Sequence, residues 1–189
     1  MKLLKNIFLF LIFVAISIFT LSFFAPTQQR VEKSILISAK PAEVYNQMML
    51  LQNFNNWSVW GKADSTIKYT TEGKDGVVGT KIGWEGSPQL AGKGEITLTA
   101  LQKDKSIMHD VNLFEPQQLQ ARSKFELNPV GNQTEVRWTF VIPSTRPFNI
   151  FNLFYNLDKE RGSDFAAGLN ALKLMVEKMP LKDPAVPGS

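Results

Sequence analysis

The feature that most constrains this chain is a long amphipathic helix near its end, predicted over residues 157–179. Its apolar residues recur at steps of three and four, which places them on one stripe of the helix while polar residues point away. The stripe consists of Phe165, Leu169, Leu172, Val176 and Met179, and Pro180 ends the helix. A stripe this continuous needs a broad apolar partner. Because the middle of the chain offers only strands, we expect a curved sheet that closes over this helix.

The sheet is predicted from alternating apolar and polar residues. A short polar linker over residues 28–30 precedes a first strand at 31–38. Six further strands, separated by turn residues, are predicted at 67–72, 80–85, 94–101, 107–114, 119–127 and 134–142. The last two alternate cleanly, so one face of the sheet is expected to be dry and the other wet.

Two short elements are expected between the first and second strands. A helix opens at Pro41, a residue tolerated in the first turn, and its inner side consists of Val44, Met48 and Leu51. Residues 53–61 follow as a short aromatic element, helical or irregular.

The N-terminus holds 18 uncharged residues, 7–24, which as a helix would span about 27 Å of a bilayer core of about 30 Å. A secretory signal peptide has a shorter apolar core and ends in small residues, and Thr20-Leu21-Ser22 is a passable cleavage pattern. We favour an uncleaved transmembrane anchor; secretion after cleavage is the alternative. Lys2 and Lys5 favour a cytoplasmic N-terminus and an extracytoplasmic domain.

Composition excludes several classes of function. The chain has no cysteine and one histidine, which excludes disulfides and thiolate sites and leaves little for a metal, so neither metal nor cofactor is expected. Without Lys2 and Lys5, the 21 basic residues become 19 against 17 acidic ones. The rest of the chain is so nearly neutral that it lacks the positive charge of a nucleic-acid-binding surface. We divide the chain into a flank and anchor (1–28), one domain (29–180) and a loose tail (181–189).

Several short motifs follow one another in a familiar order. They are Ser34-Ile35-x-Ile37-x-Ala39-x-Pro41-x-x-Val44, Trp57-Ser58-x-Trp60, Trp84-x-Gly86, Gly92-x-Gly94, Phe114-x-Pro116 and Gly162-x-Asp164-Phe165-x-x-Gly168-Leu169-x-x-Leu172-Lys173. Together with the order of elements, they resemble the polyketide cyclase/dehydrase and lipid-transport superfamily, also called SRPBCC or START-like, in its bacterial members with an N-terminal membrane segment. The resemblance covers residues 31–179.

This resemblance implies an α+β helix-grip fold, in which about seven antiparallel strands wrap around the C-terminal helix and leave a deep apolar cavity. Relatives include carriers, aromatase/cyclases and chaperone-activating domains, so the fold alone does not decide the function. We expect a non-catalytic protein that binds a hydrophobic small molecule or lipid at the membrane. The alternatives are a cyclase or dehydratase that uses the same cavity and an interaction module whose cavity is collapsed.

The candidate ligand-binding residues are inward strand positions and two helix positions: Trp84, Ile96, Leu98, Phe125, Trp138, Phe140, Phe165 and Leu169. Trp57 and Trp60 are expected to cover one end. The alternative is that these side chains pack against each other as core. His109 is a weak catalytic candidate, because no acid or second base stands at an identifying spacing. A solvent-facing or structurally bonded histidine is the favoured interpretation.

The segment 148–157 is unusually rich in aromatic residues. Its candidate membrane-contact or lid residues are Phe148, Phe151, Phe154 and Tyr155, which would touch the bilayer or gate the passage of lipid. The alternative is a short helix packed across the end of the sheet.

Overall fold

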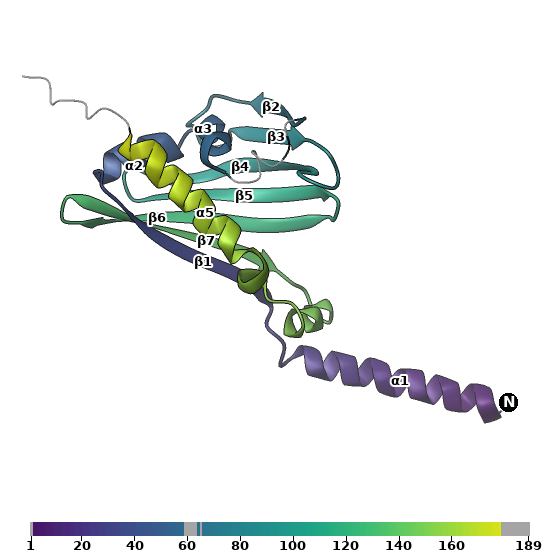
Figure 1. Cartoon of the computed structure of the whole chain (residues 1–189). Coiled ribbons are helices and arrows are strands. Elements are labelled where there is room, and N and C mark those ends of the chain that lie inside the picture. Colours follow the sequence, from purple (N-terminus) through teal and green to yellow (C-terminus); the bar gives the residue numbers. More distant parts are fainter. Residues whose placement is uncertain (1, 59–63, 65, 179–189) are drawn as a thin grey trace, which may run out of the picture.

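A seven-stranded antiparallel sheet wraps one face around a long helix in the computed structural model, which describes residues 2–58, 64 and 66–178 (Figure 1). The strands are β1 (Gln28–Ile37), β2 (Lys68–Glu72), β3 (Lys81–Glu85), β4 (Lys93–Gln102), β5 (Ser106–Glu115), β6 (Leu119–Val130) and β7 (Gln133–Pro143). Their order is β1-β7-β6-β5-β4-β3-β2, so the first strand pairs with the last. All seven predicted strands are present, and the α+β helix-grip fold is confirmed.

The long helix α5 (Leu157–Glu177) begins at Asn156, whose side chain accepts a hydrogen bond from the Lys159 amide. It packs across the sheet and contacts β1 most extensively. Its predicted stripe is buried from Phe165 to Val176, whereas Asn170 on the opposite side is exposed. Met179 and Pro180, which the sequence placed at the end of this helix, lie outside the described residues.

Two short helices bridge β1 and β2. Helix α2 (Pro41–Met48) buries Val44 and Met48 as predicted, but Leu51 does not belong to it. Leu51 instead begins α3 (Leu51–Trp57), because the Asp75 carboxylate accepts hydrogen bonds from the amides of Leu51 and Gln52, at 2.8 and 3.2 Å, and so caps a new helix.

The predicted polar linker over residues 28–30 was wrong. Gln28, Gln29 and Arg30 are the first residues of β1 and pair with the end of β7. Their side chains are polar, yet strand pairing uses backbone groups, so side-chain polarity did not reveal it. The domain therefore begins almost directly after helix α1 (Lys2–Ser22).

The core between the sheet and α5 is strongly aromatic. Trp138 on β7 stacks on Phe125 of β6 at 4.8 Å between ring centroids and contacts Phe165 of α5 at 4.5 Å. Trp57 at the end of α3 meets Trp138 edge-on at 5.6 Å. Gly168 gives α5 room for this cluster, because a Cβ there would lie 3.3 Å from the Trp138 ring. Sheet and helix are thus held together by the same few rings.

Phe125→Ala should lower the free energy of unfolding by about 3–5 kcal/mol, since it removes a fully buried ring and leaves a cavity. Urea unfolding of the full chain in detergent, followed by tryptophan fluorescence, measures this loss. Met108→Ala on the opposite face of the sheet, where the side chain is 37% exposed, is the control and should change stability far less. Equal losses for the two variants would contradict the assignment of this core.

Candidate functional site

The interior between the sheet and α5 gathers the predicted ligand-binding residues. Of these, seven are almost completely buried: Trp57, Ile96, Leu98, Phe125, Trp138, Phe165 and Leu169. Trp84 and Phe140 are half-buried, and Trp60 lies outside the described residues. All nine described members of the set belong to one hydrophobic cluster. The sequence thus identified a group of residues that the fold brings together.

The centre of this interior is filled by aromatic rings in mutual contact. Phe125, Trp138 and Phe165 are stacked or tilted against one another, and Trp57 contacts two of them edge-on. Offset and edge-on ring pairs are favourable packing arrangements. In this conformation these side chains act as core, which was the favoured interpretation for each of them individually, whereas a cavity was favoured for the set as a whole.

At one end of the interior the apolar side chains are not fully buried. Half-buried apolar side chains lie there near the C-terminal ends of β3, β5 and β7: Trp84, Val111, Phe140 and Ile142. This is the end of the sheet at which β1 begins and α1 joins the domain. The Trp84 indole is held there by a hydrogen bond of 3.1 Å to the Ala91 carbonyl. We call this region the open end of the grip.

His109 lies inside the interior, contrary to the favoured expectation of an exposed or hydrogen-bonded histidine. The strand β5 turns it inward beside Ile107, and it is 2% exposed between Leu98 and Ser123 on the neighbouring strands. Its ring meets Phe125 edge-on at 5.9 Å. Neither ring nitrogen has a hydrogen-bond partner among the described residues. The strand register decided this, and one residue of slippage would have turned Asp110 inward instead.

Burial without a partner disfavours the charged form of His109. It lowers the pKa of His109 from its usual 6.5 to about 4, so the imidazole is neutral at physiological pH. A neutral imidazole offers one hydrogen-bond donor and one acceptor. The histidine can therefore bind an uncharged hydroxyl or carbonyl group.

Three further polar groups face the same interior. The Trp138 indole N–H donates a hydrogen bond of 2.9 Å to the Ser123 hydroxyl. The Trp57 indole nitrogen, on a residue only 1% exposed, has no partner within the described ranges. Sequence reasoning missed Ser123, whose place on the inward face was visible in the strand alternation but whose partner was not.

Carboxylates in the described structure serve the surface and the loops. Asp64, 4% exposed, accepts hydrogen bonds from the Thr66 amide, the Thr66 hydroxyl and the Ser87 amide. These bonds, the Thr66 hydroxyl first, lower the pKa of Asp64. Asp64 thereby ties the chain before β2 to the turn after β3, a role that its sequence context did not reveal. The described residues contain no cluster of three acidic or histidine side chains that could hold a metal.

The aromatic segment after β7 forms the short 3-10 helix η1 (Phe148–Leu153). Phe148, Phe151 and Phe154 are 66–85% exposed and Tyr155 is 45% exposed, whereas Asn149 is fully buried. The segment packs through Asn149 and presents its rings outward. A surface pocket of about 340 Å³ lies beside it, lined by Pro26, Gln28, Gln29, Asn152, Leu153, Phe154, Tyr155, Asn156, Lys159 and Glu160.

The stability of the protein should fall as the pH drops from about 6.5 to 4 because of His109. The unfolded histidine binds a proton below its usual pKa while the folded one stays neutral down to about 4, so folding loses roughly 1.4 kcal/mol per pH unit in this window and nothing above it. His109→Phe should remove that slope and leave the carboxylate contribution. The imidazole proton resonance of this only histidine reports its pKa directly. A folded-state pKa near 6.5 would contradict the burial of the ring.

Comparison with known proteins supports the fold. No family model and no curated protein matches the sequence. Solved structures do match: truncated norcoclaurine synthase from Thalictrum flavum is similar over 81% of this chain and 96% of its own, with a TM-score of 0.60 and 10% identity. The Aha1 dimer from Colwellia psychrerythraea is similar over 79% of this chain and 96% of its own, with a TM-score of 0.56 and 21% identity.

A third similar structure is protein MLL2253 from Mesorhizobium loti, with a TM-score of 0.58 and 15% identity over 81% of this chain and all of that one. At these identities the likeness shows the fold alone. It covers about four fifths of this chain. The structural neighbours of this domain thus share its helix-grip fold, which is the fold that the motifs predicted.

Proposed function

We propose that the domain binds a hydrophobic small molecule or lipid between the sheet and α5, without catalysing a reaction, and that it does so at the membrane surface. The observation that carries this proposal is an apolar interior in which buried polar atoms lack partners. The ring nitrogens of His109 and the indole nitrogen of Trp57 have none among the described residues. An unpaired buried polar group costs about 1–3 kcal/mol. A bound molecule with one polar group would remove that cost.

The binding free energy favours a ligand that is mostly apolar and carries one polar group. Burying about 300 Å² of apolar ligand surface contributes roughly 7 kcal/mol, and association costs at least about 4 kcal/mol of this. Apolar contact alone therefore gives weak binding. A hydroxyl or carbonyl group that reaches His109 supplies the missing affinity and selects among apolar molecules. A charged group is disfavoured there, because burying it in this apolar interior costs more than one hydrogen bond returns.

The open end is the natural route for such a molecule. It lies at the end of the sheet where α1 joins, and its half-buried side chains continue the apolar lining to the surface. Helix α1 is 21 residues long and exposes apolar side chains along its length, as expected of a membrane anchor. A domain held at the bilayer by α1 would have this opening close to the lipid from which a ligand comes.

An enzyme remains the alternative from another class. The protein from Thalictrum flavum is named as a synthase, and it shares this fold. Against a similar role here, the inward-facing Ser123 hydroxyl is hydrogen-bonded to the Trp138 indole, and neither group titrates near neutral pH. His109 stands without an acid or second base bonded to it in the described structure. A binding role needs neither group.

Native mass spectrometry of the full chain, purified from its host membrane in detergent, should show a defined small molecule that stays bound when the detergent is removed. Val111→Trp narrows the open end and should reduce the bound fraction at least tenfold. Val130→Trp, at an exposed hairpin position, makes the same change of residue and should retain the ligand. Circular dichroism checks that both variants are folded.

A chain that stays empty after incubation with host lipid extract would contradict the binding role. Conversion of a candidate ligand during that incubation would establish the enzyme instead.

A further inference from the structure

The end of helix α1 is built into the folded domain. Asn149 of η1 is fully buried, and its side-chain amide donates hydrogen bonds of 2.8 Å to the Ser22 carbonyl and 3.0 Å to the Ala25 carbonyl. The Arg146 side chain reaches the Ser22 carbonyl at 3.5 Å and lies 4.7 Å over the Phe23 ring. Carbonyl groups at the end of a helix have no partner within it, so these side chains cap α1 from outside.

The residues that follow α1 are held in the same way. The side-chain amide of Asn152 donates a hydrogen bond to the Pro26 carbonyl at 2.8 Å, and the backbone amide of Ser144 donates one to the Thr27 carbonyl at 2.9 Å. Gln29 then donates to the Tyr155 carbonyl at 2.7 Å and accepts from the Leu157 amide at 3.0 Å. Five residues from the end of the helix to the start of β1 are therefore bonded to the segment that joins β7 to α5: Ser22, Ala25, Pro26, Thr27 and Gln29. A flexible tether would show no such contacts.

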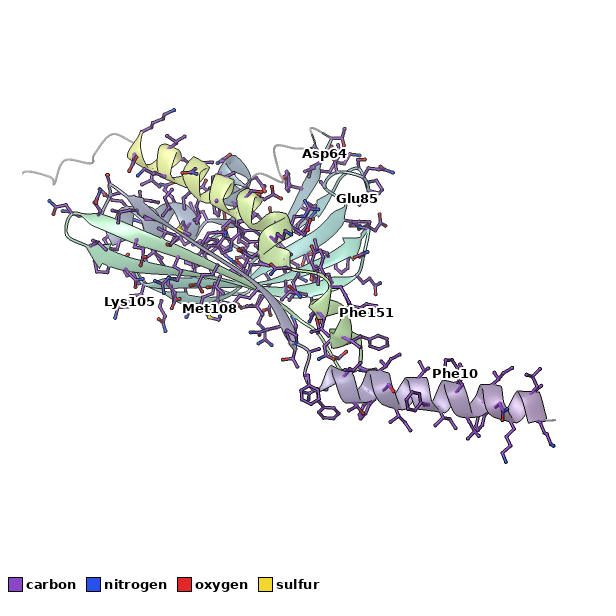
Figure 2. All side chains as sticks on the ribbon, turned by 60° about the horizontal axis from the view of Figure 1, so that its bottom comes forward. Phe10, Asp64, Glu85, Lys105, Met108 and Phe151 are labelled. Carbon is purple, nitrogen blue, oxygen red and sulfur yellow. The ribbon has the colours of Figure 1, made fainter. Side chains whose placement is uncertain are left out.

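The exposed rings lie around this junction. Phe148, Phe151 and Phe154 come from η1 and its end, and Phe23 and Phe24, 55% and 81% exposed, directly follow α1. Figure 2 shows the Phe151 side chain projecting on the side along which α1 runs away from the domain. Aromatic side chains gather at membrane–water interfaces, where the end of a membrane-spanning helix lies.

We propose that this junction fixes the domain on the bilayer, with Phe148, Phe151 and Phe154 inserted in the lipid interface beside the end of α1. The inference rests on the proposed position at the membrane and adds a defined orientation to it. The partner is the bilayer, because the rings lie at the end of an exposed apolar helix that is long enough to cross a membrane. It also follows that α1 is retained, since cleavage after Ser22 would remove a carbonyl that both Asn149 and Arg146 bind.

Depth measurements test the membrane contact. The chain has no cysteine, so single cysteines carry a nitroxide label without background. In nanodiscs of phosphatidylethanolamine and phosphatidylglycerol, labels on full-length Phe151→Cys and Phe154→Cys should be accessible to oxygen and shielded from a water-soluble nickel complex. A label on Lys105→Cys, at the end of the sheet away from α1 (Figure 2), should show the reverse. Labels at 151 and 154 as water-accessible as the one at 105 would overturn the proposal.

Distance measurements test the fixed junction. Labels at Phe10 and Lys105, one on each side of the junction, should give a narrow distance distribution in the full chain. Asn149→Ala should broaden this distribution, and Arg146→Ala, at an exposed residue whose loss leaves the core intact, should broaden it to a smaller degree. Asn170→Ala on the exposed side of α5 is the matched control. A broad distribution in the unaltered chain would show a flexible tether and overturn the proposal.

The two proposals can fail separately. The intact mass of the protein from its host should include residues 2–22, and a mature chain that starts at Phe23 would overturn the retained anchor while leaving ligand binding open to measurement. Loss of the ligand in mass spectrometry with full shielding at positions 151 and 154 would instead refute only the binding role.

Discussion

The contact between the apolar stripe of α5 and the inner face of the sheet holds the rest of this structure in place. Trp138 is its centre, because it meets Phe125 from the neighbouring strand, Phe165 from α5 and Trp57 from α3. Strand β7, which carries Trp138, also joins the first strand to the rest of the sheet. Removing these rings would therefore loosen the helix, the short helices and the closure of the sheet together.

Buried polar groups in this protein fall into two kinds. Thr134 and Asn149 bond to backbone carbonyls of distant segments and so fix where those segments lie. His109 and the Trp57 indole are buried just as deeply but have no hydrogen-bond partner within the described structure. The first kind explains the architecture. The second kind connects no segments of the chain. We therefore interpret these groups as hydrogen-bonding sites for a bound molecule.

Sequence patterns predicted most of the fold because they follow from burial. The alternation of Val136, Trp138 and Phe140 and the helical spacing of Phe165 and Leu169 directly record which side chains face the core. Contacts made by backbone groups do not produce a pattern of apolar residues in the sequence. The pairing of Gln28–Arg30 with β7 and the capping of α3 by Asp75 depend on residues far apart in the chain.

The candidate site divides along the same line. Its apolar members were found because the alternation of apolar residues shows that they lie inward. Ser123 was missed because its role depends on the hydrogen bond that it accepts from Trp138, which the sequence does not show. The inward orientation of His109 required the register of β5, which the sequence left open. Asn149 lies in an aromatic run that drew attention to its neighbours, although it is the residue that holds the segment in place.

One edge of the sheet is β2, which is five residues long, is exposed throughout, and begins with Lys68 and ends with Glu72. A protein confined to a membrane plane meets copies of itself often, and an unpaired strand is the part of a sheet most prone to join another chain. Shortness and charge at this edge oppose such pairing. In the proposed attachment to the membrane, the chain would thus combine proximity to lipid with a safeguard against the self-association that crowding on a surface promotes.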